Sequence, residues 1–287
     1  MGSPPTPNQP TIENALRAGR SRLDALSESA SLDAQVLLAH VLHVDRGWLF
    51  AHPEDSLSAE AARDWEDALG RLEKGEALPY VLGEWEFFGL SIYVTPDVLI
   101  PRPETELLVE TALDWLGKHP ERQQVVDVGT GSGCIAVALA VKEPGLKVTA
   151  YDISEAALRV AARNAERHGV SARIEFLQAD LLAGVEGPFD VVCANLPYIP
   201  SGRVKGLDVY AREPHIALDG GKDGLAFIGP LLEQAKRKIN DGGLILAEID
   251  PGLEDDIVQL AKNQFETFGP VVSKDLEGRA RLLIIQT

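Results

Sequence analysis

From Gln124 to the C-terminus, short apolar runs alternate with longer runs in which apolar residues recur at helical spacing. The apolar runs have the length and composition of strands that are buried on both faces of a sheet. They are Val125–Val128, Val148–Tyr151, Ile174–Leu177, Val191–Ala194, Leu244–Ile249 and Leu282–Ile285. The helical runs between them are Gly133–Val141, Glu155–His168, Leu225–Asn240 and Leu253–Asn263. This alternation predicts an α/β fold whose sheet is mostly parallel, doubly wound and covered by helices on both faces.

The first part of the chain follows a helical period only. Thr11 can cap a first helix, the run Leu32–His43 is apolar almost all round, and Ser58 precedes a further run at helical spacing. We therefore expect a small all-helical domain over residues 11–78, with Leu32–His43 as its central helix. Residues 1–10 contain four prolines and no charged side chain, which is typical of a disordered tail.

Residues 79–98 differ from both of their neighbours. Trp85 and Phe88 precede Gly89, and apolar residues alternate after it, which predicts a β-hairpin with its turn near Gly89. This hairpin would link the helical domain to the α/β domain, residues 99–287. Its aromatic side chains either pack at the hinge or contact the substrate.

Arg102 lies between two prolines, directly before a helix that we expect to start near Glu104. An acidic side chain in the first turn suits the helix dipole. The segment is therefore either a well-capped helix start or a fixed cation beside the ligand edge of the sheet.

One predicted strand, Val191–Ala194, ends in the loop Asn195-Leu196-Pro197-Tyr198. Proline stops the strand and stiffens the loop, which then lies at the carboxyl edge of the sheet, where open α/β folds bind ligands. The side-chain oxygen of Asn195 and a neighbouring carbonyl can accept both hydrogens of an –NH2 group, and Tyr198 offers a flat face for stacking. The loop therefore suits a planar amine or amide that is held for reaction. The same four residues would also occur in an ordinary loop in which an asparagine forms the turn after a strand.

A glycine-rich turn, Gly129-Thr130-Gly131-Ser132-Gly133, directly follows the first strand of the α/β domain. Glycine lets the backbone approach a ligand and adopt positive φ. The dinucleotide pattern Gly-x-Gly-x-x-Gly is not met, because Cys134 stands where its third glycine belongs, and no Gly-Lys phosphate loop is present. The turn therefore suits a nucleoside-like ligand without a pyrophosphate.

Two acidic residues follow the next two strands. Asp152-Ile153 ends the second strand, at the distance from the glycines that suits ribose hydroxyls, and Asp180-Leu181 follows the third, where a carboxylate and an apolar side chain suit an adenine ring. Each acid alone can be a helix cap. Because the carboxyl ends of parallel strands share one edge, we expect both to lie near Asn195.

Charge and composition limit the class of partner. The net charge is −17, and residues 1–78 carry seven Lys/Arg against thirteen Asp/Glu, so no basic face for nucleic acid is indicated. The two cysteines, Cys134 and Cys193, lie in apolar surroundings, and neither a secretory signal pattern nor a membrane-length apolar run is present, so we expect a cytoplasmic protein. His40 and His43 have helical spacing, but no further ligand pattern accompanies them and no metal site is expected.

Together these motifs resemble class I S-adenosylmethionine-dependent methyltransferases that act on nitrogen, and more narrowly the bacterial release-factor glutamine methyltransferases. The resemblance covers nearly the whole chain, including the helical domain and hairpin. Its most specific parts are Ile100-Pro-Arg-Pro-Glu-Thr-Glu106 and the segment from Arg212-Glu213-Pro214 through Leu225. One departure is Leu196, where the family usually has the first proline of Asn-Pro-Pro-Tyr; Asn-Leu-Pro-Tyr is also similar to the loop of ribosomal-RNA adenine dimethylases.

The resemblance implies a Rossmann-like fold and methylation of the glutamine side-chain amide in the Gly-Gly-Gln motif of class 1 peptide-chain release factors, gripped by the helical domain, without nucleic acid or membrane. It implies that Asn195 and Tyr198 are catalytic and that Asn195, Leu196, Pro197 and Tyr198 bind the substrate. The residues that would bind S-adenosylmethionine are Gly129, Thr130, Gly131, Ser132, Gly133, Asp152, Ile153, Asp180, Leu181 and Asn195. Two rival hypotheses are an adenine-N6 methyltransferase acting on DNA or RNA, which would flip a base into the same loop, and a non-catalytic cofactor-binding scaffold.

Overall fold

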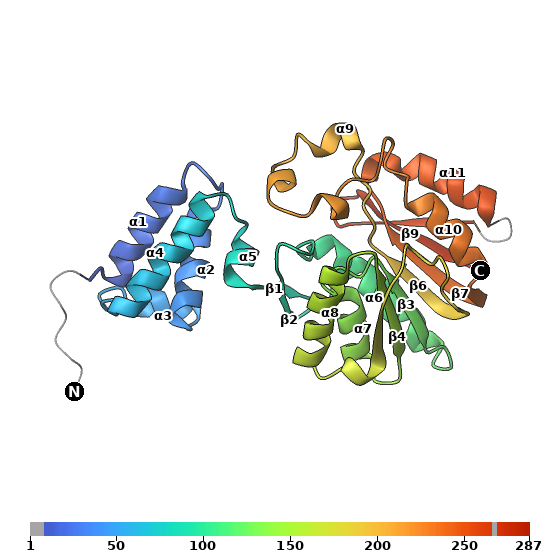
Figure 1. Ribbon diagram of the computed structural model, residues 1–287, viewed down its shortest axis with the longest axis horizontal. Helices are drawn as coiled ribbons and strands as arrows, with labels where there is room; N and C mark the ends of the chain where they lie inside the picture. The colour runs from blue at the N-terminus through green and yellow to red at the C-terminus, as the bar shows by residue number, and fades with distance from the viewer. Residues whose placement is uncertain (1–8, 266–268) are drawn as a thin grey trace. The chain divides into compact units, whose positions relative to one another are not determined.

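The computed structural model describes residues 9–265 and 269–287, and the chain forms two compact units, Met1–Gly83 and Glu84–Thr287 (Figure 1). Residues 1–8 of the expected tail lie outside the described residues. At the end of that stretch, the Pro10 carbonyl accepts a hydrogen bond from the N–H of Leu57 at 3.0 Å. This bond ties the entry of the chain to the first unit.

The first unit is built from helices. They are α1 (Ile12–Leu23), α2 (Ala30–Leu42), α3 (Arg46–Ala51), α4 (Ala59–Glu73) and α5 (Leu78–Leu82). The side chains of Thr11, Asp45 and Ser58 accept backbone N–H groups at the starts of α1, α3 and α4, which explains where these helices begin. Helix α2 contacts the other four helices and buries Leu37 and Leu38 completely, so the prediction of a central helix is confirmed.

The hairpin begins later than expected. Its strands are β1 (Glu84–Phe87) and β2 (Leu90–Tyr93), which pair antiparallel. The start of the expected hairpin is instead the short helix α5, because Pro79 sits in its first turn, where proline favours a helix. Gly83 ends that helix with φ of +74°, a conformation that glycine adopts without strain.

The second unit contains a seven-stranded sheet in the order β5-β4-β3-β6-β7-β9-β8. Its strands are β3 (Gln124–Val128), β4 (Lys147–Asp152), β5 (Ile174–Gln178), β6 (Phe189–Ala194), β7 (Ile239–Glu248), β8 (Val271–Lys274) and β9 (Ala280–Gln286). Strands β3 to β7 are parallel, whereas β9 and β8 are antiparallel. The strand order reverses between β3 and β6, and such a switch point is where open α/β sheets bind ligands.

Helices cover both faces of this sheet, as predicted. The helices of the unit are α6 (Glu106–Lys118), α7 (Cys134–Lys142), α8 (Glu155–Arg167), α9 (Ser201–Val204), α10 (Ile228–Lys236) and α11 (Glu254–Gln264). Helix α7 contacts α6 and α8 on one face, and α10 contacts α11 on the other (Figure 1). The doubly wound, mostly parallel α/β fold is therefore confirmed.

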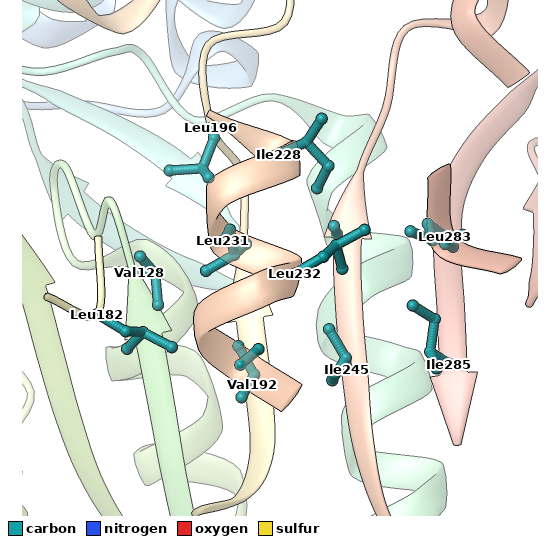
Figure 2. Close-up of a cluster of buried hydrophobic side chains, with 14 of the residues drawn as sticks. Val128, Leu182, Val192, Leu196, Ile228, Leu231, Leu232, Ile245, Leu283 and Ile285 are labelled. Carbon is teal, nitrogen blue, oxygen red and sulfur yellow. The ribbon is translucent and has the colours of Figure 1, made fainter. Parts of the chain in front are cut away.

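The α10 face carries a large apolar core (Figure 2). Val192 and Ile245 of the central strands point toward Leu231 and Leu232 of α10, and all four side chains are fully buried. Leu196, the first residue after Asn195, joins the same cluster and is 8% exposed. The loop at the end of β6 is thus anchored by burial of an apolar side chain, which offers a fixed base for the polar residues beside it.

Besides the hairpin start, two further elements differ from the sequence predictions. The helix expected over Leu225–Asn240 is shorter, because Ile239 already pairs with Phe189 as part of β7. Strand β8 was not predicted, since Val271 is 59% exposed and the strand is too short and too polar to stand out as an apolar run.

Candidate active site

A cavity of about 240 Å³ lies at the carboxyl ends of the parallel strands. Val128 pairs with Ala194, and Ala194 pairs with Ala247, so the residues that follow leave three strands at the same level of the sheet. Eleven of the residues expected to bind cofactor or substrate line the cavity: Gly129, Thr130, Gly131, Ser132, Asp152, Ile153, Asp180, Leu181, Asn195, Leu196 and Pro197. The topology thus brings together motifs that are up to about seventy residues apart in the sequence.

The glycine-rich turn has the conformation that its composition predicts. Gly129, Gly131 and Gly133 have φ of +71°, +55° and +79°. A Cβ at Gly129 would stand 2.8 Å from a methyl carbon of Leu196, whereas at Gly131 the nearest atom is the Gly129 carbonyl oxygen at 4.0 Å. Gly131 therefore leaves open space beside the cavity that a ligand can occupy.

Gly133 serves a different purpose from the other two glycines. It lies at the start of α7, and a Cβ there would stand 2.9 Å from the Cβ of Ala161 in α8. It is not among the residues that line the cavity. Its part in the site is therefore to allow α7 and α8 to pack closely behind the turn.

Asp152 joins the end of β4 to the glycine-rich turn. Its Oδ2 accepts the N–H of Gly131 and its Oδ1 accepts the N–H of Ser154, both at 2.8 Å. Burial raises the pKa of this carboxyl group, and the backbone hydrogen bonds oppose that rise. A carboxylate has about four acceptor positions, so Asp152 retains capacity to accept ribose hydroxyl groups from the cavity.

Asp180 and Leu181 form the wall beyond Asp152. Leu181 has φ of +52°, an uncommon conformation for a residue with a Cβ and one that often marks functional sites. The next N–H, of Leu182, donates to Oε1 of Gln234 at 2.7 Å, which holds the turn against α10. Asp180 itself is exposed at the edge of the cavity, so its carboxylate is accessible to a ligand.

Asn195 is held by a buried polar chain that runs between helix α6 and strand β7. Its Nδ2 donates to Oγ1 of Thr105 at 3.0 Å, and that hydroxyl donates to Oε2 of Glu248 at 2.6 Å. The hydroxyl of Tyr198 donates to the other carboxylate oxygen, Oε1, at 3.1 Å. Thr105 is 2% exposed and Glu248 is 5% exposed, so the chain is shielded from water. The two residues named as catalytic therefore converge on one carboxylate.

Sequence reasoning did not identify Thr105 or Glu248 as site residues. In the sequence, Thr105 is only one member of the Pro-Glu-Thr-Glu run. The available signal for Glu248 was a carboxylate inside the apolar run Leu244–Ile249, since a charged residue in a buried strand needs a specific partner.

Burial sets the protonation of this chain. It raises the pKa of the Tyr198 hydroxyl well above its usual range, and the neighbouring Glu248 carboxylate raises it further, so Tyr198 remains a hydrogen-bond donor. Burial also raises the pKa of Glu248, while the hydrogen bonds from Thr105 and Tyr198 oppose that rise. Tyr198 is thus placed to orient its neighbours rather than to lose its proton.

A second cavity, of about 220 Å³, adjoins the first one at the Asn195 loop. Tyr198, Ile199, Val209 and Leu218 line it and do not line the first cavity. Six residues line both cavities: Leu99, Arg102, Asn195, Leu196, Pro197 and Ala217. The Asn-Leu-Pro-Tyr loop therefore forms a partition that the two cavities share.

Arg102 is fixed at this partition. It forms an ion pair with Glu213, whose other oxygen accepts the N–H of Ile100 at 3.1 Å. Glu213 is 6% exposed. The two most specific motifs of the sequence, around Arg102 and Glu213, are thus bound to each other at the site.

His40 and His43 have ring centroids 6.3 Å apart, and within residues 9–265 and 269–287 no three His, Cys, Asp or Glu side chains are grouped to hold a metal ion. Among the described residues, none of the helices is both long and apolar enough for a membrane span.

Comparison with family models places two domains on the chain. Residues 14–83 match the PrmC N-terminal domain, and residues 103–212 match the methyltransferase small domain. Solved structures of low identity support the fold: a methyltransferase of Pyrococcus furiosus is 22% identical, with a TM-score of 0.50 over 76% of this chain and 97% of that one. A 16S ribosomal RNA methyltransferase of T. thermophilus, solved with AdoMet and guanosine, is 19% identical, with a TM-score of 0.53 over 71% of this chain and 49% of that one.

Relatives of known name extend over nearly the whole chain. The release factor glutamine methyltransferase of Koribacter versatilis is 37% identical over 96% of this chain and 98% of its own length. The protein of the same name from Moorella thermoacetica is 40% identical over 96% of this chain and 98% of its own length. These alignments cover 96% of this chain and so extend across both compact units. The chain belongs to the release factor glutamine methyltransferase family.

Proposed function

We propose that this enzyme transfers a methyl group from S-adenosylmethionine to the side-chain amide nitrogen of the glutamine in the Gly-Gly-Gln motif of class 1 peptide-chain release factors. The observation that carries the proposal is the position of Asn195, a polar partition between two cavities with its Nδ2 bonded inward to Thr105. The names of the full-length relatives support the same substrate.

The first cavity has the properties that S-adenosylmethionine requires. The open space at Gly131 admits the ligand close to the backbone, Asp152 offers acceptors for ribose hydroxyls, and Leu181 with exposed Ile153 offers apolar contact for a purine. The carboxylate of Asp180 lies where it can accept from the adenine amino group. When bound, S-adenosylmethionine supplies an electrophilic methyl group on a sulfonium sulfur.

The second cavity suits the glutamine side chain. Leu99, Val209 and Leu218 line it together with Asn195 and Leu196. We assign the Asn195 Oδ1 and the Leu196 carbonyl as the acceptors for the glutamine amide. Two acceptors can hold both amide hydrogens and so aim the nitrogen lone pair across the partition. These two hydrogen bonds also favour partial loss of the conjugation between the amide nitrogen and its carbonyl group, which makes the nitrogen a better nucleophile.

Positioning is the main catalytic contribution in this account. Fixing two reactants in a productive geometry can supply about 7–11 kcal/mol relative to free encounter. Transfer would form the nitrogen–methyl bond as the sulfur–methyl bond breaks, with S-adenosylhomocysteine as the leaving group. The nitrogen becomes acidic only as the methyl group arrives, so no strong base has to precede attack, and the released proton passes to water. Tyr198, whose hydroxyl is bound to Glu248, lines the acceptor cavity, and we assign its ring to confining the substrate amide.

We assign recognition of the release factor to the helical unit and the methyl transfer to the α/β unit. All residues proposed to touch S-adenosylmethionine or the glutamine lie between Asp97 and Phe227, so the first unit is assigned to gripping the release factor. Its excess of acidic residues suits a protein partner better than nucleic acid. Two buried, free cysteines accord with the reducing cytoplasm, where translation takes place.

A panel of acceptors tests the proposal. The enzyme is incubated with methyl-labelled S-adenosylmethionine and either a class 1 release factor, its Gly-Gly-Ala variant, duplex DNA or ribosomal RNA. Label should enter the parent factor alone. Label in the Gly-Gly-Ala factor at the same rate, or in nucleic acid only, contradicts the proposal.

A further inference from the structure

The donors and acceptors around Asn195 can be assigned one by one. Thr105 has a single hydroxyl proton, and the shortest contact of that oxygen, 2.6 Å, is to a carboxylate that accepts. The hydroxyl therefore has only lone pairs to offer Asn195, and the atom that faces it at 3.0 Å must be the Nδ2 donor. The opposite atom of the amide, Oδ1, is then directed away from Thr105.

We propose that Glu248, acting through Thr105, is a positioning residue that fixes the polarity of the Asn195 amide so that its oxygen meets the acceptor nitrogen. The inference rests on the proposed function and adds residues to the site that sequence motifs do not include. Neither side chain lines the acceptor cavity in which the glutamine would bind. Thr105 lines the first cavity, whereas Glu248 lines neither of the two cavities. An effect of Glu248 on the reaction therefore passes through the side chains that it holds, Thr105 with Asn195 on one side and Tyr198 on the other.

A carboxylate suits this position because it is acceptor-only. A neutral amide at position 248 could offer an NH2 group to Thr105. The threonine proton would then point at Asn195, which would turn its oxygen inward and its NH2 group toward the substrate. Two NH2 groups would face each other, and the acceptor nitrogen would lose one of its two hydrogen-bond acceptors.

The second oxygen of Glu248 holds Tyr198, so the carboxylate is bound from both sides. Tyr198 Oη donates to Oε1 at 3.1 Å while Thr105 donates to Oε2. These bonds fix the plane of the carboxylate and leave it no freedom to exchange partners. Burial at 5% exposure keeps water from competing for the same lone pairs.

Three variants distinguish the effect of hydrogen-bond polarity at Asn195 from the effect of side-chain packing. Thr105→Val keeps the shape and removes the hydroxyl, Thr105→Ser keeps the hydroxyl and removes the methyl, and Glu248→Gln changes an acceptor into a group that can donate. The matched control is Thr111→Val, because Thr111 in α6 donates to the Leu107 carbonyl at 2.7 Å, away from the site. Circular dichroism and thermal unfolding establish that each variant is folded.

The kinetic readout uses a Gly-Gly-Gln release factor as acceptor. For Thr105→Val and Glu248→Gln, kcat should fall by about tenfold or more, with KM for both substrates within about threefold of the parent. Thr105→Ser and Thr111→Val should keep kcat within about threefold. Equal kcat for Thr105→Val and the parent, or an equal loss in Thr105→Ser, would overturn the inference.

A second readout needs no acceptor. Hydrogen exchange of the Asn195 side-chain amide, assigned by NMR with the Asn195→Ala variant, should be slowed in the parent and in Thr105→Ser and fast in Thr105→Val. Unchanged exchange in Thr105→Val refutes the positioning role whatever the substrate is. If exchange behaves as expected but the parent does not methylate the factor, the proposed function fails and the positioning of Asn195 stands.

Discussion

The side-chain amide of Asn164 makes both hydrogen bonds of a strand pair with the backbone of Tyr93. Its Oδ1 accepts the Tyr93 N–H at 2.7 Å, and its Nδ2 donates to the Tyr93 carbonyl at 2.9 Å. The same Nδ2 donates to the Ser132 carbonyl at 2.8 Å, and Asn164 is fully buried. One side chain of α8 therefore joins the hairpin to the glycine-rich turn.

Asn164→Ala should lower the free energy of unfolding by about 2–4 kcal/mol, because it leaves backbone groups of Tyr93 and Ser132 without their partner. Urea unfolding measures the change. The control is Asn263→Ala, which alters an exposed side chain of α11 that accepts from Gln259 at 2.9 Å. Equal stability of the two variants would show that the Asn164 bonds contribute little.

Asp152→Ala should weaken binding of S-adenosylmethionine by about 1.5–3 kcal/mol, the value of a hydrogen bond to a charged group. The turn also loses the acceptor for Gly131 N–H, so the loss should fall at the upper end of this range. Calorimetry measures the affinity, with Glu155→Gln as a control, since Glu155 is an exposed residue in the first turn of α8. Unchanged affinity in Asp152→Ala would remove this residue from the cofactor site.

Asp127 gives a prediction about pH. This carboxyl group is fully buried beneath the glycine-rich turn, and burial raises its pKa to about 7, while a 2.6 Å hydrogen bond from Thr130 opposes the rise. In the unfolded chain the pKa is about 4. Because the folded value is the higher one, the stability contributed by the protonated form is complete below pH 4 and is lost as the pH rises toward 7.

The comparison is with Asp127→Asn, which does not titrate. The free energy of unfolding of the parent, minus that of the variant, should decrease between pH 4 and 7 by at most about 1.4 kcal/mol per pH unit, and should level off above pH 7. Urea titrations at each pH measure it. A difference that stays constant across this range would mean that Asp127 is ionised throughout.

Removal of residues 1–83 tests whether the helical unit recognises the release factor while the rest of the chain carries out the methyl transfer. The unit Glu84–Thr287 should fold alone, because it has its own core, and it should keep its affinity for S-adenosylmethionine. Methylation of an intact release factor should fall steeply, since binding energy far from the reacting group helps to orient it. A short Gly-Gly-Gln peptide should be methylated about equally by both forms. If the truncated enzyme acts on the whole factor as well as the parent does, the helices have no part in recognition.

Periodicity identified most of the fold because its strands are buried on both faces. Val191–Ala194 reads as an apolar run for that reason, whereas β8 at Val271–Lys274 is an exposed edge strand and gave no such signal. The residues at which helices and strands begin and end were predicted less accurately. The helix predicted to reach Asn240 stops at Lys236, because pairing of Ile239 with Phe189 decides that boundary, and this pairing is a tertiary contact.

The residues of the candidate site also form two groups, those that could be predicted from the sequence and those that could not. Residues in loops directly after strands, such as Gly129, Asp152 and Asn195, could be placed on one edge from topology alone. Thr105 and Glu248 could not, because they are 143 residues apart and their meeting depends on how α6 packs against β7. A buried hydrogen-bond chain is a property of three-dimensional packing and has no spacing rule in the sequence.

Mass spectrometry of a methylated release factor identifies the atom that receives the methyl group. The factor is treated with parent enzyme or with Asn195→Ala, digested, and fragmented to locate the added methyl group. We expect one methyl group on the side-chain nitrogen of the Gly-Gly-Gln glutamine with the parent, and none with Asn195→Ala, although that variant remains folded. A methyl group on any other residue, or the same yield from Asn195→Ala, would contradict the proposed function.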